Sequence, residues 1–307
     1  MLAALTGATG FLGRSIAEAL QARGYRLRIL GRPGASFERS AEIVTGRLAD
    51  ADALARLAEG AELIVHAAGL IKARRPSDFL PVNVQGARRM AEAAARQAPD
   101  ARFVLVSSLS AREPQLSAYA ASKAAGENAV REVLAPERLT IVRPPAIYGP
   151  GDRETLALFQ AIARLPALPA PGPAKARLAL IHVADAAAQI ADLAERDAAG
   201  RIFALADGRP EGYGWGEIVT EASRAVGRRP WVLPTPGAAI LALGAAGSIA
   251  GRLGPARIMT WGKAREALHG DWGVRPHELA AGLTPPLFDL ASGFADAVAG
   301  YRARGWL

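Results

Sequence analysis

Tyr119 and Lys123 are the side chains of this sequence best suited to moving a proton. They stand four residues apart in a segment with a helical pattern, so a phenol and an ammonium group would share one helix face. A nearby positive charge favours the deprotonated form of a phenol, which would let Tyr119 exchange a proton with a hydroxyl or carbonyl oxygen. The chain has only four lysines against 33 arginines, so a lysine at this position is informative.

A hydroxyl follows one of the expected strands. Arg102–Ser107 has the apolar pattern of a buried strand, and Ser108 comes directly after it. From the end of a strand, Ser108 could donate a hydrogen bond to a substrate oxygen and stabilise charge that develops there. A serine pair after a strand is also a common turn or helix cap, so a structural role stays open.

The first residues of the chain predict a binding site for a phosphate group. Leu2–Thr6 is apolar with strand character, glycines follow at 7, 10 and 13, and Ser15–Leu20 has a helical pattern. Gly7 would allow a tight turn, Gly10 a close approach of backbone amides to a pyrophosphate, and Gly13 close packing of helix on strand. The anion would then lie at the helix N-terminus, where free N–H groups and the dipole favour negative charge.

Strands and helices alternate over about the first 200 residues, which predicts an α/β fold with a doubly wound parallel sheet of Rossmann type. After Pro150 the pattern becomes irregular and proline-rich, which indicates a smaller, discontinuous substrate lobe, although Leu178–Arg196 should return a strand and helix to the main sheet. We therefore expect a nucleotide-binding domain over 1–149 and 178–206, and a substrate-binding lobe over 150–177 and 207–307.

Composition excludes several classes of function. The 307 residues are half hydrophobic and contain no cysteine, so disulfides, thiolate metal sites and a cysteine nucleophile are absent. The net charge of +8 comes from basic residues that look dispersed, which argues against nucleic-acid binding. The four histidines lack metal-ligand spacing, and His66 and His182 are expected to be structural, so no metal is predicted.

The longest apolar run, Gly237–Gly251, is too short and glycine-rich for a membrane span. We expect a buried helix lining an apolar cavity, while peripheral membrane contact stays open. No secretion signal is apparent after Met1, so a cytoplasmic protein is expected, either a monomer or a homodimer.

Taken in order, these features resemble the extended branch of the short-chain dehydrogenase/reductase superfamily, which includes NAD-dependent epimerase/dehydratase-like and hydroxysteroid/dihydroflavonol reductase-like members. The further motifs that carry the resemblance are His66–Gly69, Asn83–Gly86, Arg143–Gly151, Ile181–Asp185 and the ending Tyr301–Leu307.

The resemblance implies a Ser-Tyr-Lys triad of Ser108, Tyr119 and Lys123, with Tyr119 and Lys123 also touching the cofactor. The other cofactor-binding positions that it implies are Gly7, Thr9, Gly10, Phe11, Leu12, Gly13, Arg32, Arg47, Leu48, Ala67, Ala68, Gly69, Pro144, Pro145 and Ala146.

Two basic residues indicate which cofactor is preferred. At the end of the second strand the chain has Gly31-Arg32, with no carboxylate before Glu38, and a guanidinium pairs well with a phosphate. Where the family often has Gly-Asp-Leu, this chain has Gly46-Arg47-Leu48. We therefore predict a preference for NADP(H), with NAD(H) possible, while Arg32 could instead be a solvated loop residue.

The leading hypothesis is hydride transfer between NADP(H) and a carbonyl or alcohol of a small-molecule substrate. The first alternative is a nucleotide-sugar epimerase or dehydratase, for which Arg177, Arg252 and Arg257 are candidate phosphate ligands. The second alternative is a non-catalytic NADP(H)-binding sensor or assembly factor.

Overall fold

The computed structural model describes residues 1–37, 39–170, 175–196, 200–253 and 260–307. Glu38 and Arg257 lie outside the described residues, as does the side chain of Arg252. The chain forms two compact units, each assembled from separate stretches of sequence.

The first unit comprises residues 1–144, 186–204 and 280–284, and the second comprises 145–185, 205–279 and 285–307. The predicted limits at 149/150 and 206/207 lie near the borders at 144/145 and 204/205, whereas the predicted limit at 177/178 lies before the border at 185/186. As limits of functional domains they stay a prediction.

The first unit is built on a parallel sheet of seven strands, whose order is β11-β6-β5-β4-β1-β2-β3. The strands are β1 (Leu2–Thr6), β2 (Arg26–Gly31), β3 (Glu42–Thr45), β4 (Leu63–His66), β5 (Arg102–Val106), β6 (Leu139–Arg143) and β11 (Ile202–Ala204). The order reverses between β1 and β4, which is where ligands bind in doubly wound sheets. The predicted Rossmann-type fold is confirmed.

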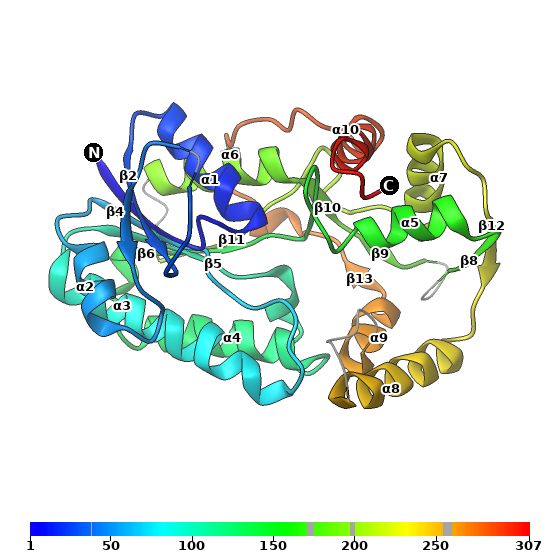
Figure 1. Ribbon diagram of the computed structural model, residues 1–307, viewed down its shortest axis with the longest axis horizontal. Coiled ribbons are helices and arrows are strands. Elements are labelled where there is room, and N and C mark those ends of the chain that lie inside the picture. Colours follow the sequence, from blue (N-terminus) through cyan, green and yellow to red (C-terminus); the bar gives the residue numbers. More distant parts are fainter. Residues whose placement is uncertain (38, 171–174, 197–199, 254–259) are drawn as a thin grey trace. The chain divides into compact units, whose positions relative to one another are not determined.

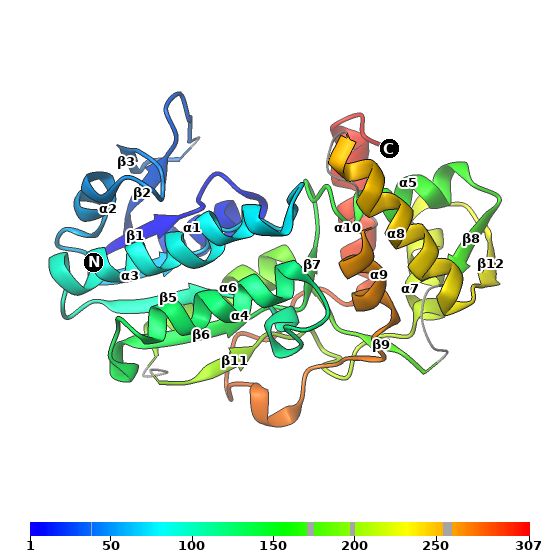
Figure 2. The same cartoon turned by 90° about the horizontal axis from the view of Figure 1, so that it is seen from below.

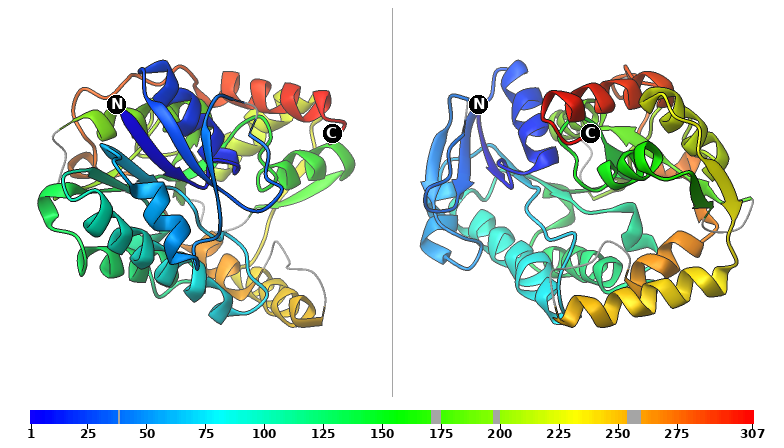
Figure 3. Two further views of the ribbon diagram at one scale, coloured as in Figure 1. Left: turned by 60° about the vertical axis from the view of Figure 1, so that its left-hand side comes forward. Right: turned by 45° about the vertical axis from the view of Figure 1, so that its right-hand side comes forward.

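Helices cover both faces of this sheet, with α2, α3 and α4 on one face and α1 and α6 on the other (Figure 1; Figure 3, left). Their bounds are α1 (Phe11–Ala22), α2 (Ala51–Ala58), α3 (Gln85–Gln97), α4 (Ala118–Arg131) and α6 (Val183–Glu195). Short 3₁₀ turns η1 (Pro76–Phe79), η3 (Leu109–Arg112) and η4 (Pro136–Arg138) and a π turn η2 (Leu80–Val84) complete the unit.

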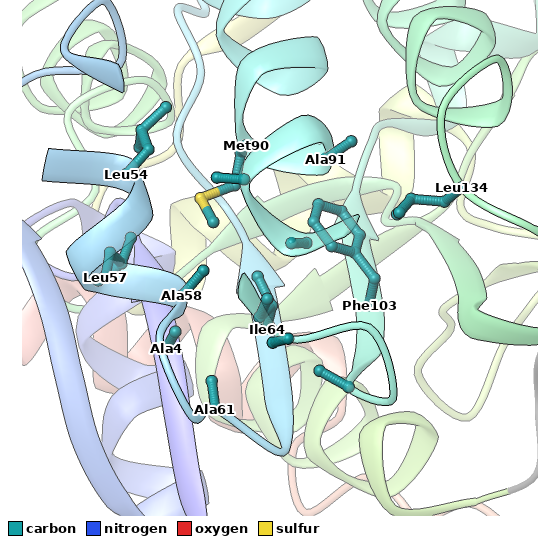
Figure 4. Packing of buried hydrophobic residues seen from close by; sticks show 14 of the residues in the cluster. Ala4, Leu54, Leu57, Ala58, Ala61, Ile64, Met90, Ala91, Phe103 and Leu134 are labelled. Carbon is teal, nitrogen blue, oxygen red and sulfur yellow. The ribbon is translucent and has the colours of Figure 1, made fainter. Parts of the chain in front are cut away.

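The core of the first unit follows from helical periodicity. The buried positions of α3 include Ala87, Met90, Ala91 and Ala94, which share one face of the helix. Figure 4 shows Met90 and Ala91 on the side of α3 that faces Ile64 of β4 and Phe103 of β5, which belong to the same buried cluster. The small alanines let α3 lie close to the sheet.

The helix predicted from Phe79 to Gln97 begins only at Gln85, because the preceding residues form η1 and η2 instead. Pro81 lies within η2 and has no backbone N–H to donate, so a regular α-helix is disfavoured there. A π turn of this kind is frequent at functional sites.

The prediction that Leu178–Arg196 returns a strand to the main sheet is wrong. The strand in that stretch, β10 (Leu180–His182), pairs with β7 (Ala146–Tyr148) in a separate two-stranded sheet of the second unit. The seventh strand of the main sheet is β11, which pairs in parallel with β6.

The second unit combines three two-stranded parallel sheets with helices. Besides β7 and β10, its strands are β8 (Ala167–Ala170), β9 (Arg177–Leu178), β12 (Trp231–Pro234) and β13 (Asp271–Trp272). Its helices are α5 (Leu156–Arg164), α7 (Trp215–Val226), α8 (Gly237–Leu253), α9 (Trp261–Leu268) and α10 (Leu290–Ala303), with one 3₁₀ turn, η5 (Pro276–Glu278). Its core contains a group of aromatic rings among aliphatic side chains, in which the ring centroid of Phe294 lies 4.9 Å from that of Tyr148 and 5.2 Å from that of Phe159.

The apolar run Gly237–Gly251 is a helix, as predicted, but the prediction that this helix is buried is wrong. In α8 only Ile240, Gly244 and Gly251 are buried among residues 237–251, whereas Leu243 and Ile249 are 55% and 62% exposed. One side of α8 packs on α9, as Figure 2 shows. No helix among the described residues is long and apolar enough to cross a bilayer.

Candidate active site

The glycine turn after β1 lies against the segment that follows β4. Gly7 has a φ of +79°, in the left-handed region that favours glycine, and an added Cβ would come within 2.7 Å of the Ala68 backbone nitrogen. An added Cβ on Gly13 would come within 1.9 Å of the Gly7 carbonyl oxygen. The first glycine therefore makes the turn, and the third lets α1 pack against it.

The N-terminus of α1 has the features that an anion requires. Gly10 is its N-cap residue and provides no side-chain cap, and the first turn contains no acidic residue. The backbone N–H groups at this end are therefore available to phosphate oxygens, with the helix dipole favouring negative charge. The predicted role of Gly7, Thr9, Gly10, Phe11, Leu12 and Gly13 in cofactor binding fits this geometry.

Thr6 and His66 join the ends of β1 and β4. Thr6 Oγ1 lies 2.9 Å from Nδ1 of His66, and the backbone N–H of Ala68 donates to Thr6 Oγ1 at 3.2 Å. Burial, with a contribution from the positive charge of Lys123, lowers the pKa of His66 to about 3. His66 is therefore neutral at physiological pH and holds Ala67–Gly69 beside the glycine turn, in agreement with the predicted structural role.

Ser108 lies just beyond β5 and caps a short turn. Its Oγ accepts a hydrogen bond from the backbone N–H of Ser110 at 3.2 Å, and it is the N-cap residue of η3. The neighbouring Leu109 N–H donates to the Pro144 carbonyl oxygen at 2.8 Å, which places Pro144 near Ser108. The Ser108 hydroxyl donates to Ser110 Oγ at 3.2 Å, so it must turn away from that partner before it can donate to a substrate oxygen.

Helix α4 brings Lys123 to the same end of β5. The ammonium Nζ of Lys123 donates to the carbonyl oxygen of Val106, the last residue of β5, at 2.8 Å. Burial lowers the pKa of Lys123 to about 8, although the carboxylate of Glu127 acts in the opposite direction. Tyr119 lies one turn earlier on α4, with its ring 6.0 Å from that of Phe79.

Asn83, in the π turn η2, holds the loop that follows Gly69. Its side chain accepts from Leu70 N–H at 2.7 Å and donates to the Leu70 carbonyl oxygen at 3.0 Å and to Ser122 Oγ at 2.9 Å. The Ser122 hydroxyl in turn donates to the Tyr119 carbonyl oxygen at 2.7 Å. One amide thus links the loop after β4 to the turn of α4 that carries Tyr119.

Glu127 and Arg143 form a buried ion pair that was not predicted from the sequence motifs. Glu127 is 1% exposed and accepts two hydrogen bonds from the guanidinium of Arg143, at 2.8 and 2.6 Å, and one from Ser107 Oγ at 2.5 Å. The spacing of four residues from Tyr119 to Lys123 and again from Lys123 to Glu127 could have indicated that all three share one helix face. The pair ties α4 to the ends of β5 and β6.

A small cavity of about 10 Å³ lies among His66, Asn83, Ser107, Lys123 and Glu127. That volume is about the space of one water molecule. Ala68, Ala87, Leu105 and Gly126 complete its lining. Nε2 of buried His66 has no hydrogen-bond partner among the described residues.

The two arginines predicted to select the cofactor lie at the ends of neighbouring strands. Arg32 follows β2 and Arg47 closely follows β3, and these strands pair in parallel with Gly31 opposite Thr45. Both arginine side chains are exposed. Leu48 is instead half-buried against α3, where an added Cβ on Gly86 would come within 2.8 Å of its Cδ1.

The first unit thus brings together the sequence-predicted residues from Gly7 to Pro144 along the carboxyl edge of one sheet. Pro145 and Ala146 belong to the second unit, where Ala146 begins β7. Their contact with a cofactor stays a prediction.

Comparison with known proteins shows the family to which the chain belongs. A model of the NAD dependent epimerase/dehydratase family matches residues 3–206. Ceramide reductase of Caulobacter vibrioides is 49% identical over 309 residues, which cover 99% of this chain and 95% of that protein.

Solved structures of low identity share the fold. A human epimerase family protein solved with NADPH has a TM-score of 0.74 at 18% identity, covering 97% of this chain and 99% of that one. A Thermus thermophilus UDP-glucose 4-epimerase solved with NAD has a TM-score of 0.72 at 22% identity, covering 98% and 99%.

The resemblance to extended short-chain dehydrogenases/reductases is therefore confirmed. With the family model spanning residues 3–206 and a reductase 49% identical over nearly its whole length, the chain belongs to the NAD dependent epimerase/dehydratase family and is an NAD(P)-binding oxidoreductase.

Proposed function

We propose that this protein reduces a ketone on a ceramide-type lipid to the alcohol, using NADPH. The observation that carries the proposal is the 49% identity to a ceramide reductase over 99% of this chain and 95% of that protein. Two proteins that align end to end share their substrate-binding parts as well as the Rossmann fold. Fold alone would leave the substrate open.

Tyr119, Ser108 and Lys123 are the residues proposed to act on the carbonyl. Tyr119 would give the proton to the oxygen, and the Ser108 hydroxyl would donate a hydrogen bond to that oxygen as negative charge develops on it. Lys123, held on the Val106 carbonyl oxygen at 2.8 Å, would place a positive charge one helical turn from Tyr119 and favour its phenolate after proton transfer.

The residues around the glycine turn would hold the cofactor, with its phosphates at the N-terminus of α1 and its nicotinamide end toward Ala67–Gly69 and Lys123. A bound nicotinamide supplies the hydride for such a reduction. The chain's own contribution is to fix the carbonyl oxygen between Ser108 and Tyr119 and to keep that oxygen in place during transfer.

Arg32 and Arg47 are proposed to bind the 2′-phosphate that distinguishes NADPH from NADH. Two exposed guanidinium groups at the ends of adjacent strands would both donate hydrogen bonds to the oxygens of one phosphate. Arg32→Ala should raise the Kd for NADPH roughly 10- to 100-fold, as expected for losing a charged hydrogen bond, and leave that for NADH nearly unchanged. Equal losses for both cofactors would contradict this role.

A thermal-shift comparison tests the cofactor first. At a hundredfold excess over Kd, a ligand that binds only the folded state stabilises it by about 2.7 kcal/mol. A clear rise in Tm with NADP(H) and a smaller one with NAD(H) is expected. An equal or larger shift with NAD(H) would remove the argument from Arg32 and Arg47 and favour the epimerase alternative.

Turnover tests the reaction itself. The wild-type protein should consume NADPH with a ketone of ceramide type, and Tyr119→Phe should lose about 10²- to 10⁴-fold in kcat while still binding NADPH. Interconversion of UDP-sugars without net NADPH consumption would establish the epimerase alternative instead. Cofactor binding without turnover of either substrate class would favour a non-catalytic NADP(H)-binding sensor or assembly factor.

A further inference from the structure

Over the described residues 237–251, the exposed face of helix α8 carries no charged or polar side chain. Its exposed positions are Ala238, Ala239, Ala242, Leu243, Ala246 and Ile249. At 3.6 residues per turn these six positions fall within an arc of about 140°. The solvent face of a surface helix is ordinarily charged or polar, so this face is unusual for a protein surrounded by water.

The strand that leads into α8 extends the same apolar surface. In β12, Trp231 is 78% exposed and Leu233 is 53% exposed, and Val232 between them is also exposed. Only Thr235 and Pro236 separate β12 from α8, and the right-hand view of Figure 3 shows the chain running from one to the other. The exposed apolar residues of β12 and α8 are called the docking surface below.

The sequence around the docking surface is strongly positive. Between Glu221 and Glu266 the chain has seven arginines and lysines and no acidic residue. Two of these cations, Arg228 and Arg229, are exposed directly before β12. Basic residues are dispersed over the whole chain, and what distinguishes this segment is that it lacks acidic residues, although Arg224 and Lys263 pair with the acids at its two ends, Glu221 and Glu266.

We propose that the docking surface binds the surface of a lipid bilayer that carries anionic headgroups. The apolar face of α8 would enter the boundary between headgroups and acyl chains, where Trp231 is also favoured, and the flanking arginines would pair with headgroup phosphates. A second copy of this chain fits the surface poorly, because two positive segments would then face each other across a symmetric interface.

Binding of α8 and β12 to a bilayer does not depend on the proposed reaction. It adds to that reaction a route to a substrate that is itself embedded in a membrane. The two ideas can fail separately, since binding to vesicles is measured without any substrate.

Flotation of the purified full-length protein with vesicles tests the proposal. Wild-type protein should float with phosphatidylcholine vesicles that contain 30% phosphatidylglycerol, and binding should fall at least fivefold in 0.5 M NaCl because salt screens the headgroup charge. Pure phosphatidylcholine vesicles should bind at least fivefold less. Absence of binding to the anionic vesicles at low salt would overturn the proposal.

Paired variants locate the contact. Leu243→Ser combined with Ile249→Ser should reduce vesicle binding at least tenfold, and Trp231→Ser provides a second variant that does not alter α8. Leu287→Ser is the matched control, because Leu287 is 80% exposed but lies outside the docking surface. Equal losses in the control and in the docking-surface variants would overturn the assignment.

Two further readouts distinguish a lipid contact from a protein contact and from misfolding. Circular dichroism and gel filtration should show that the variants fold and keep the wild-type oligomeric state. A variant that changes oligomeric state without changing vesicle binding would assign the surface to a protein contact and overturn the proposal. Turnover of a short, water-soluble ketone should be unchanged by the docking-surface variants, whereas turnover of a vesicle-borne ketone should fall with binding.

Discussion

The carboxyl edge of the main sheet and the docking surface differ in almost every physical respect. Near the carboxyl ends of β4 and β5, three polar side chains are buried or half-buried and are held by specific partners: Lys123 on Val106, Asn83 on Leu70, and Glu127 on Arg143. On α8 and β12, apolar side chains are exposed, and the exposed cations Arg228 and Arg229 precede them in the chain. The first region fixes individual atoms for chemistry, whereas the second offers a broad surface that needs no single atom in place.

This difference predicts how the two regions respond to substitution. At the sheet edge a single added or missing atom should be costly, because positions are fixed to within ångströms. On the docking surface single changes should leave stability nearly unchanged.

The largest effect is expected at Gly13, where a Cβ would lie 1.9 Å from the Gly7 carbonyl oxygen. Gly13→Ala should displace the glycine turn, weaken NADPH binding at least a hundredfold and lower Tm. The matched variant is Gly216→Ala in α7, where a Cβ meets nothing within 4 Å and should stabilise the helix by about 0.5–1 kcal/mol. Unimpaired NADPH binding by Gly13→Ala, measured by isothermal titration calorimetry, would contradict the assigned role of the turn.

The second effect is expected at the buried pair of Glu127 and Arg143. Glu127→Gln should lower the free energy of unfolding by about 3 kcal/mol, because it leaves the Arg143 guanidinium largely buried without its counter-charge. The exposed pair of Arg88 and Glu132 supplies the control, since Glu132→Gln should change unfolding little. Urea denaturation with circular dichroism measures both, and similar losses in the two variants would show that burial is not decisive.

The third effect is a pH dependence at Lys123, whose pKa is about 8 in the fold against the ordinary lysine value of 10.5. Between these two values the folded chain binds fewer protons than the unfolded chain, so the contribution of Lys123 to the free energy of unfolding rises with pH. Below pH 8 the destabilisation that results from burying the charged Lys123 is fully present. Lys123→Met should remove this rise between pH 8 and 9.5, and so should Lys123→Arg, which stays charged throughout. An identical slope in the wild type and both variants would refute the lowered pKa.

The smallest effect is expected on the docking surface. Ile249→Ser should change the free energy of unfolding by no more than about 0.5 kcal/mol, as surface substitutions usually do. The same change at Ile240, which is 3% exposed on the opposite side of α8, should cost about 2–4 kcal/mol. A large loss at Ile249 would mean that this residue is covered in solution and would remove the contrast between the two regions.

The fold and the glycine turn of the first region could be predicted from the sequence because their requirements are local, while the chemical roles of its residues stay a prediction. A left-handed turn needs glycine, a phosphate needs free N–H groups, and a phenol–ammonium pair needs a spacing of four residues, all of which can be read from a few positions. The alternation of strands and helices predicted a parallel doubly wound sheet, whereas the position of β1 between β4 and β2 came only from the structure. Glu127 escaped prediction because its partner Arg143 is distant in sequence, although its spacing from Lys123 was visible.

The second unit could be predicted less well, for two physical reasons. Short strands such as β10 carry no signal for which partner they join, so its pairing with β7 could not be separated from a return to the main sheet. An uncharged helix such as α8 is read as buried, since burial is the usual fate of apolar residues. The lack of acidic residues between Glu221 and Glu266 was visible in the sequence, but no single motif reveals it.

The absence of acidic residues between Glu221 and Glu266 has a practical consequence for mapping lipid contacts. A protease that cleaves after glutamate and aspartate has no site within residues 222–265, so it releases β12 and α8 together on one peptide, residues 222–266. Any lipid photo-crosslinked to either element would therefore be recovered on that one fragment, and a single mass would report the whole surface.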